Sequence, residues 1–170
     1  MFKKAQATYA DFLIGLLVLI AITFIFTQTI IDLNSREDKF QELITDGTAI
    51  SSSFMSSAYG SYNWAGNQPT GRLGFVRDGK VIKEDFDDYL NLLNTQDGYK
   101  KSTILLGTRN DYVFYFEFDE TKLNYGGKEV YGKYDDVDEI ESSNVIKINR
   151  VVYYDLDGRG RIVKLVVLVF

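Results

Sequence analysis

The sequence predicts an α+β fold, in which a long N-terminal α-helix packs on a C-terminal antiparallel β-sheet head with one or two short helices. Three observations predict this fold. An uncharged apolar run occupies residues 12–31, an amphipathic segment follows it, and β-branched and aromatic stretches dominate the C-terminal part. The 170 residues leave room for one modest head and one appendage.

The first element is the run FLIGLLVLIAITFIFTQTII at residues 12–31. About 20 apolar residues in a helix are what a bilayer core requires. A buried core helix and a cleaved secretory signal are the alternatives, the second because residues 1–4 (MFKK) supply a positive N-terminal region. A cleaved signal has a shorter apolar run that ends in small residues, whereas this run ends in TQTIID. We therefore expect a retained membrane-spanning helix with its N-terminus in the cytoplasm.

The helix is expected to continue past the membrane to about Ser57. Charged residues fill one face of this extension, and apolar residues recur at helical spacing on the other: Leu33, Phe40, Leu43, Ile44, Ile50 and Phe54. We expect the sheet of the head to cover this apolar stripe. Gly47 and the serines at 51–53 have low helix propensity and leave a bend open, and a helix on the membrane surface is the alternative to an extension.

Residues 58–71 are rich in Gly and Asn and contain Pro69, so they are predicted to link the helix to a head at residues 72–170. Trp64 lies in this linker. Its ring either closes the core of the head or forms an exposed surface for a sugar or a protein partner.

The first half of the head is predicted to contain a turn and two short helices. Asp78-Gly79 between apolar pairs is typical of a short hairpin. Residues 83–93 place Phe86, Tyr89, Leu90 and Leu93 on one helical face and their acids early, as a helix N-terminus favours. A second helix is expected at 99–106, with Gly107 as its end.

The second half is predicted to form the main strands. Residues 112–118 alternate so that Tyr112, Phe114, Phe116 and Phe118 share one face, which we expect to be buried against the long helix. Residues 145–154 and 161–170 read as an antiparallel hairpin around the turn at 155–160. Because residues 165–170 are apolar on both faces, they are predicted to form an inner strand.

Composition argues against several functions. A net charge of −5 makes nucleic acid an unlikely partner, and the absence of Cys and His removes thiolate metal sites and the commonest general base. Asp155 to Gly158 and the acidic run at 135–141 resemble calcium ligand sets only in part, so we interpret them as a hairpin turn and a solvated loop. We expect no enzyme, no cofactor and no metal.

The residues before the apolar run resemble a known type of signal peptide. Lys3 and Lys4 precede Ala5 and Gln6, and this arrangement resembles the class III signal peptide of archaeal type IV pilins and pilin-like proteins. The resemblance implies that a prepilin-type peptidase cuts between Ala5 and Gln6, removes the leader at 1–5 and leaves a mature helix at 6–57.

The family also has a Ser or Thr two residues after the Gln and an acid two residues further on. Thr8 matches the first position, whereas the acid follows at Asp11, one residue later than usual. The resemblance implies that Gln6 and Asp11 take part in subunit assembly. It further implies copies of the chain or other pilins as partners, membrane lipid before assembly, and a location in a cell-surface filament afterwards.

Three functions remain in order of preference. The first is a structural subunit of a pilus-type filament that serves adhesion or forms a surface appendage, with the N-terminal helix as membrane anchor and filament core. The second is a monomeric membrane-anchored extracellular protein that binds a ligand through Trp64 and the tyrosines of the head. The third is a signal-anchored hydrolase, which would have to rely on carboxylates that no motif singles out.

Overall fold

The computed structural model describes the backbone of residues 2–56 and 73–170, and the side chains of these ranges from Asp11 onward. The chain forms two compact units, Met1–Gln41 and Glu42–Phe170. The predicted linker at 58–71, with Trp64, lies outside the described residues.

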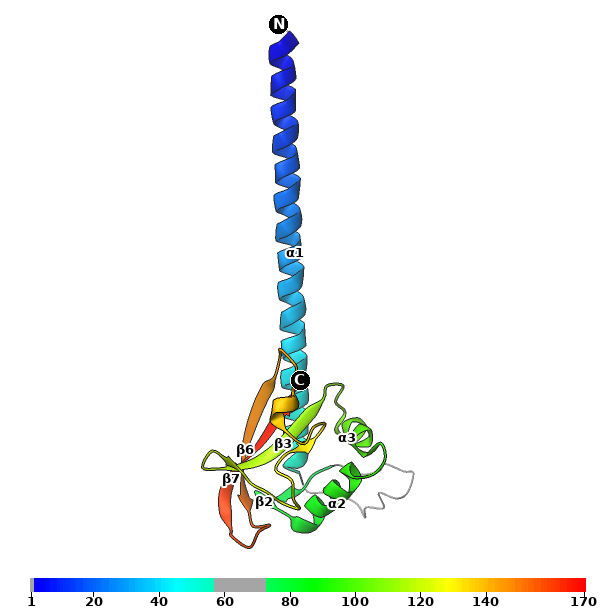
Figure 1. The fold of residues 1–170 in the computed structure, drawn as a ribbon, viewed down its shortest axis with the longest axis vertical. Coiled ribbons are helices and arrows are strands. Elements are labelled where there is room, and N and C mark those ends of the chain that lie inside the picture. The colour runs from blue at the N-terminus through cyan, green and yellow to red at the C-terminus, as the bar shows by residue number, and fades with distance from the viewer. Residues whose placement is uncertain (1, 57–72) are drawn as a thin grey trace. The chain divides into compact units, whose positions relative to one another are not determined.

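The long helix α1 runs over Phe2–Phe54 and supplies residues to both units (Figure 1). It is continuous through Gly47, so the bend that the sequence left open does not divide it. It ends at Phe54 rather than at about Ser57, because Met55 and Ser56 already form a turn.

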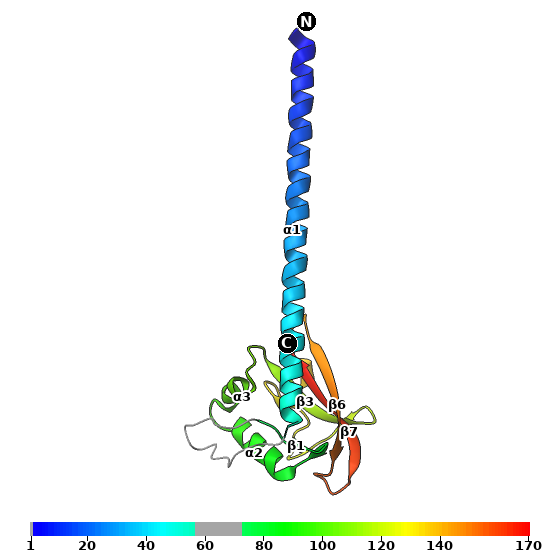
Figure 2. The same cartoon turned by 180° about the vertical axis from the view of Figure 1, so that it is seen from behind.

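The second unit contains one mixed sheet and two short helices (Figures 1 and 2). Its elements after α1 are, in chain order, β1 (Val76–Arg77), β2 (Lys80–Val81), α2 (Lys83–Leu93), α3 (Gly98–Leu106), β3 (Tyr112–Phe118), β4 (Thr121–Lys122), β5 (Tyr131–Gly132), the 3-10 helix η1 (Val137–Glu139), β6 (Ile146–Tyr154) and β7 (Arg161–Val169). The strand order is β1-β2-β6-β7-β3-β4, with β5 also paired to β3. All pairs are antiparallel except β2 with β6. The predicted α+β fold is therefore confirmed.

The local predictions for the first half of the head are confirmed. Asp78 and Gly79 both have positive φ, 52° and 76°, and turn the chain between β1 and β2. The helix predicted at 83–93 is α2. The second helix, α3, ends at Gly107, whose φ of 69° is the left-handed conformation that favours glycine at this position.

The last part of α1 packs on the inner face of the sheet. Leu43, Ile50 and Phe54 are fully buried there. A Cβ atom on Gly47 would lie 2.8 Å from Ile148 Cδ1 and 3.3 Å from Val169 Cγ2, so the glycine allows the helix to approach β6 and β7 closely. The predicted coverage of the apolar stripe holds for these residues, whereas Leu33 and Phe40, in the first unit, are exposed.

Strand β3 buries three of the four aromatic residues predicted to face the long helix. Tyr112, Phe114 and Phe116 are fully buried, and the Phe54 ring centroid lies 4.8 Å from that of Phe114. The prediction is wrong for Phe118, which is 43% exposed. It is the last residue of β3, and its ring faces the guanidinium of Arg161 instead of the core.

Strand β7 lies between β6 and β3, which confirms its prediction as an inner strand. Its second face is also covered. Val166 and Leu168 pack with Val113, Tyr115 and Val130 in a small separate cluster, to which residues from the segment around η1 contribute. This cover on the outer face explains why the end of β7 is apolar on both faces.

Candidate functional site

The apolar part of α1 in the first unit is the most distinctive surface of the described chain. Residues 11–40 are exposed throughout. Within Asp11–Phe54 the helix is long and apolar enough to cross a membrane, as judged by its length and composition. An exposed apolar surface of this kind marks a segment that is covered by lipid or by protein.

The threonine hydroxyl groups inside this apolar run are satisfied by the helix itself. The hydroxyl groups of Thr23, Thr27 and Thr29 donate hydrogen bonds of 2.8 to 2.9 Å to the carbonyl oxygens four residues earlier. Because these donors need no outside partner, the three threonines can enter an environment without water at little cost.

The predicted processing and assembly residues lie at the start of α1. Lys3, Lys4, Ala5 and Gln6 are part of the helical backbone, but their side chains lie outside the described part of the structure. Asp11 is the first residue whose side chain is described. It is exposed and is the sole charged side chain of the segment 11–31. Among the described residues it has no hydrogen bond or ion pair.

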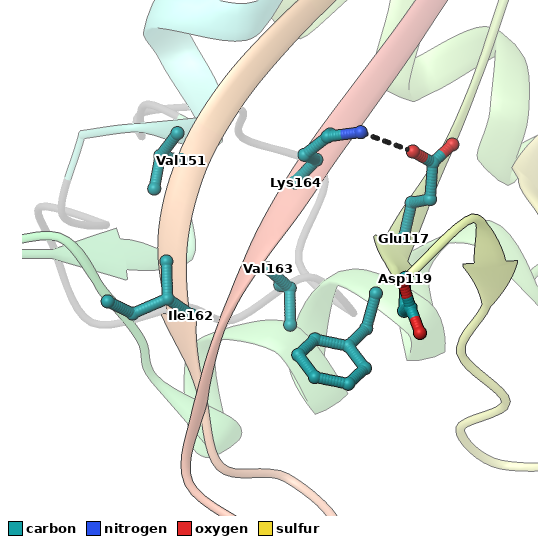
Figure 3. Close-up of a pocket in the computed structure, with 7 residues that line it drawn as sticks. Glu117, Asp119, Val151, Ile162, Val163 and Lys164 are labelled. Carbon is teal, nitrogen blue, oxygen red and sulfur yellow. Dashed lines mark hydrogen bonds and ion pairs between the residues drawn. The ribbon is translucent and has the colours of Figure 1, made fainter.

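A shallow hollow on the outer face of the sheet is the candidate binding surface of the second unit (Figure 3). It has a volume of about 350 Å³ and is lined by Glu117, Phe118, Asp119, Val151, Ile162, Val163 and Lys164. Figure 3 shows Val151 and Ile162 on the same side of the hairpin formed by β6 and β7. They are 67% and 68% exposed, so one side of the hollow is apolar.

The other side of the hollow is an ion-pair network. Lys164 Nζ donates a 2.8 Å hydrogen bond to Glu117 Oε1, and Lys147 Nζ lies 3.8 Å from Glu117 Oε2. The hydrogen bond from Lys164 holds the pKa of Glu117 below its usual value. A carboxylate that is kept ionised between two ammonium groups is a poor general acid, and the network carries one excess positive charge.

The two acidic segments considered as calcium sites have other partners. Asp157 accepts hydrogen bonds from Arg159 N and from the guanidinium of Arg161 in the turn between β6 and β7. Asp135 and Asp136 pair with Lys128 and Lys122. Within the described ranges no three Asp or Glu residues are grouped closely enough to hold a metal ion.

Sequence reasoning missed the hollow. Strand periodicity places Glu117, Val151, Ile162 and Lys164 on outward-facing positions, but their grouping depends on register. Lys164 pairs with Val151 on one side and with Glu117 on the other. The order β6-β7-β3 that creates this row was not predicted.

Comparisons of the chain with protein-family models, with curated proteins and with solved structures find no significant match.

Proposed function

We propose that this chain is a structural, pilin-like subunit of an archaeal type IV pilus-type filament. Its mature N-terminal helix would anchor the subunit in the membrane before assembly and form the filament core afterwards. The partners would be copies of the chain or other pilins, together with a prepilin-type peptidase that acts between Ala5 and Gln6.

The proposal rests mainly on the difference in burial between the two parts of helix α1. Up to residue 40, α1 exposes a long apolar surface, while from Leu43 to Phe54 one face of the same helix is buried in the core of the head. Each large apolar side chain that leaves water contributes roughly 1.5 to 3 kcal/mol, so a run of this length must be covered by lipid or by other helices. A subunit that moves from a membrane into a helical bundle satisfies this requirement in both states.

A single acid in the apolar run supports an assembly role. Asp11 would be costly in a dry bundle unless it is paired. After cleavage, the new amino group on Gln6 of a neighbouring subunit is a suitable cation. This pairing follows the role that the resemblance implies for Gln6 and Asp11.

The experiment is to express the Asp11→Asn variant in a host that processes and assembles the chain, and to measure protein in the sheared filament fraction. We expect a lower filament yield, with membrane insertion and leader cleavage unchanged. Asp32→Asn is the matched control, because Asp32 is the next acid in the same helix and lies just beyond the apolar run. A normal yield from Asp11→Asn would contradict the pairing.

A monomeric membrane-anchored binding protein is the second candidate. The hollow between Val151, Ile162 and Glu117 favours it, because this surface joins exposed apolar side chains to charged ones. The wild-type protein separates the two candidates, since a chain that is never found in the sheared fraction would favour this second function.

A further inference from the structure

Strand β6 has an open edge along most of its length. It pairs with β7 over all nine residues on one side, but with β2 at a single position, Tyr153 with Lys80, on the other. Figures 1 and 2 show β6 beside β7, with the short strand β2 near the C-terminal end of β6. No described strand pairs with this border from residue 146 to residue 152.

The direction of the backbone groups at this edge follows from one hydrogen bond. Tyr153 N donates to Gly79 O at 2.7 Å, so the N–H and C=O groups of Tyr153 point towards β2. Alternate residues of an antiparallel strand point the same way. Lys147, Asn149 and Val151 therefore present their N–H and C=O groups at the open edge, and all three residues are exposed.

Exposed edges of this kind are templates for pairing with another strand. Two features limit where a second strand can pair with this edge. The connection to β2 occupies the edge at Tyr153, so a partner strand can extend only towards the N-terminal end of β6. There, residues 141–145 are exposed and belong to no strand.

The charges beside the edge are complementary to the segment that precedes β6. Lys147 shares the single carboxylate of Glu117 with Lys164. Glu141 is exposed and has no cation partner among the described residues. In the described part of the chain, the segment before β6 therefore carries an acid without a cation partner, and β6 carries a cation that shares its only carboxylate with a second lysine.

We propose that β6 is a self-association site, at which the segment from Glu141 to Asn149 pairs antiparallel with the same segment of a second copy around a two-fold axis at Val145. In this register Ser143 lies opposite Lys147 and Glu141 opposite Asn149. Each Glu141 is then diagonal to Lys147 of the other copy, within reach of its ammonium group. Val145, which is 40% exposed, meets its own copy at the axis.

This inference does not rest on the proposed function, since it concerns an edge of the head and applies to a filament subunit and to an anchored surface protein alike. One strand pair is a small contact and weak on its own. Covalent trapping is therefore a suitable test. The chain contains no cysteine, so a single introduced cysteine reports on one position.

The experiment is oxidation of the full-length Val145→Cys variant in detergent micelles, followed by non-reducing electrophoresis. Opposed Cα atoms in a hydrogen-bonded antiparallel pair are about 5.5 Å apart, which a disulfide spans. We expect a covalent dimer. Ile162→Cys is the control, because Ile162 is at least as exposed and lies on β7, away from the edge. It should stay monomeric under the same conditions.

A second variant tests the edge itself. Asn149→Pro removes an N–H group that points away from β7, so it leaves the hairpin ladder intact while it blocks strand addition. Combined with Val145→Cys, it should abolish the covalent dimer without changing the far-ultraviolet circular dichroism. Three outcomes would overturn the proposal: no dimer from Val145→Cys, an equal dimer from Ile162→Cys, or a dimer that persists with Asn149→Pro.

Discussion

The carboxylate of Asp46 on α1 accepts a 2.6 Å hydrogen bond from the hydroxyl group of Thr108, a residue 62 positions further along the chain. The same oxygen also accepts hydrogen bonds from Asn110 Nδ2 at 2.9 Å and from Arg109 N at 3.2 Å. Asp46 therefore fastens the loop between α3 and β3 to the end of α1 that enters the core.

These hydrogen bonds give the stability of the head a defined pH dependence. Burial alone would raise the pKa of Asp46, but the hydrogen bonds from Thr108, Asn110 and the Arg109 backbone outweigh it and lower the pKa below 3.8. The folded state thus holds this proton less tightly than the unfolded state. The contribution of Asp46 to stability is complete above about pH 4 and is lost as pH falls through the lowered pKa.

Asp46→Asn should lower the free energy of unfolding by roughly 1 to 3 kcal/mol at neutral pH, the range for a hydrogen bond to a charged group or an unsatisfied donor. The difference from wild type should shrink as the pH is lowered below about 4. Denaturant titrations in detergent at several pH values measure both effects. A difference that stays constant down to pH 3 would show that the charge of Asp46 is not what matters.

The close approach of Gly47 to the sheet predicts a steric effect. Gly47→Leu places atoms where Ile148 and Val169 already lie, and such overpacking costs about 1 to 3 kcal/mol. Gly15→Leu is the matched control in the same helix, because a Cβ atom there has no neighbour within 4 Å. Urea titration should show a loss of stability for the first variant alone. Equal stability of both variants would contradict the packing at Gly47.

Among the substitutions proposed here, truncation of Phe54 should cause the largest loss in the free energy of unfolding. Its ring is fully buried, and its centroid lies 4.9 Å from that of Phe75, 4.8 Å from that of Phe114 and 5.6 Å from that of Tyr89. Phe54→Ala should cost about 3 to 5 kcal/mol, as for other buried aromatic residues. Phe40→Ala, at a position that is 50% exposed in the first unit, should change the stability of the head by about 0.5 kcal/mol or less. A similar loss of stability in Phe54→Ala and Phe40→Ala would contradict the burial of the end of α1 in the core.

Much of the fold was predictable because local pattern and tertiary structure agree. The bounds of α2 were predicted to the residue, because its apolar spacing and the acids Glu84 and Asp85 in the first turn both indicate a helix. Phe86 and Tyr89 of the predicted face are buried, but the third buried residue is Leu92, whereas Leu90 and Leu93 are only partly buried. The Asp78-Gly79 turn and the inner position of β7 could also be predicted from the sequence, since both depend on residue types at fixed short spacing.

The features that were missed depend on contacts between distant parts of the chain. Strands β4 and β5 are two residues long and exist because β3 offers them an edge, so they leave no periodic signal. Gly47 looked like a possible bend, whereas its role is contact with Ile148, about a hundred residues later. Asp46, the hollow beside Glu117 and the open edge of β6 likewise became visible only with strand order and register.

Mass spectrometry of the N-terminus of the native protein would decide whether this chain is processed as we propose for a filament subunit. We expect a mature chain that begins at Gln6, with residues 1–5 removed and the apolar helix retained. An intact Met1, or a chain that begins beyond Ile31, would contradict it.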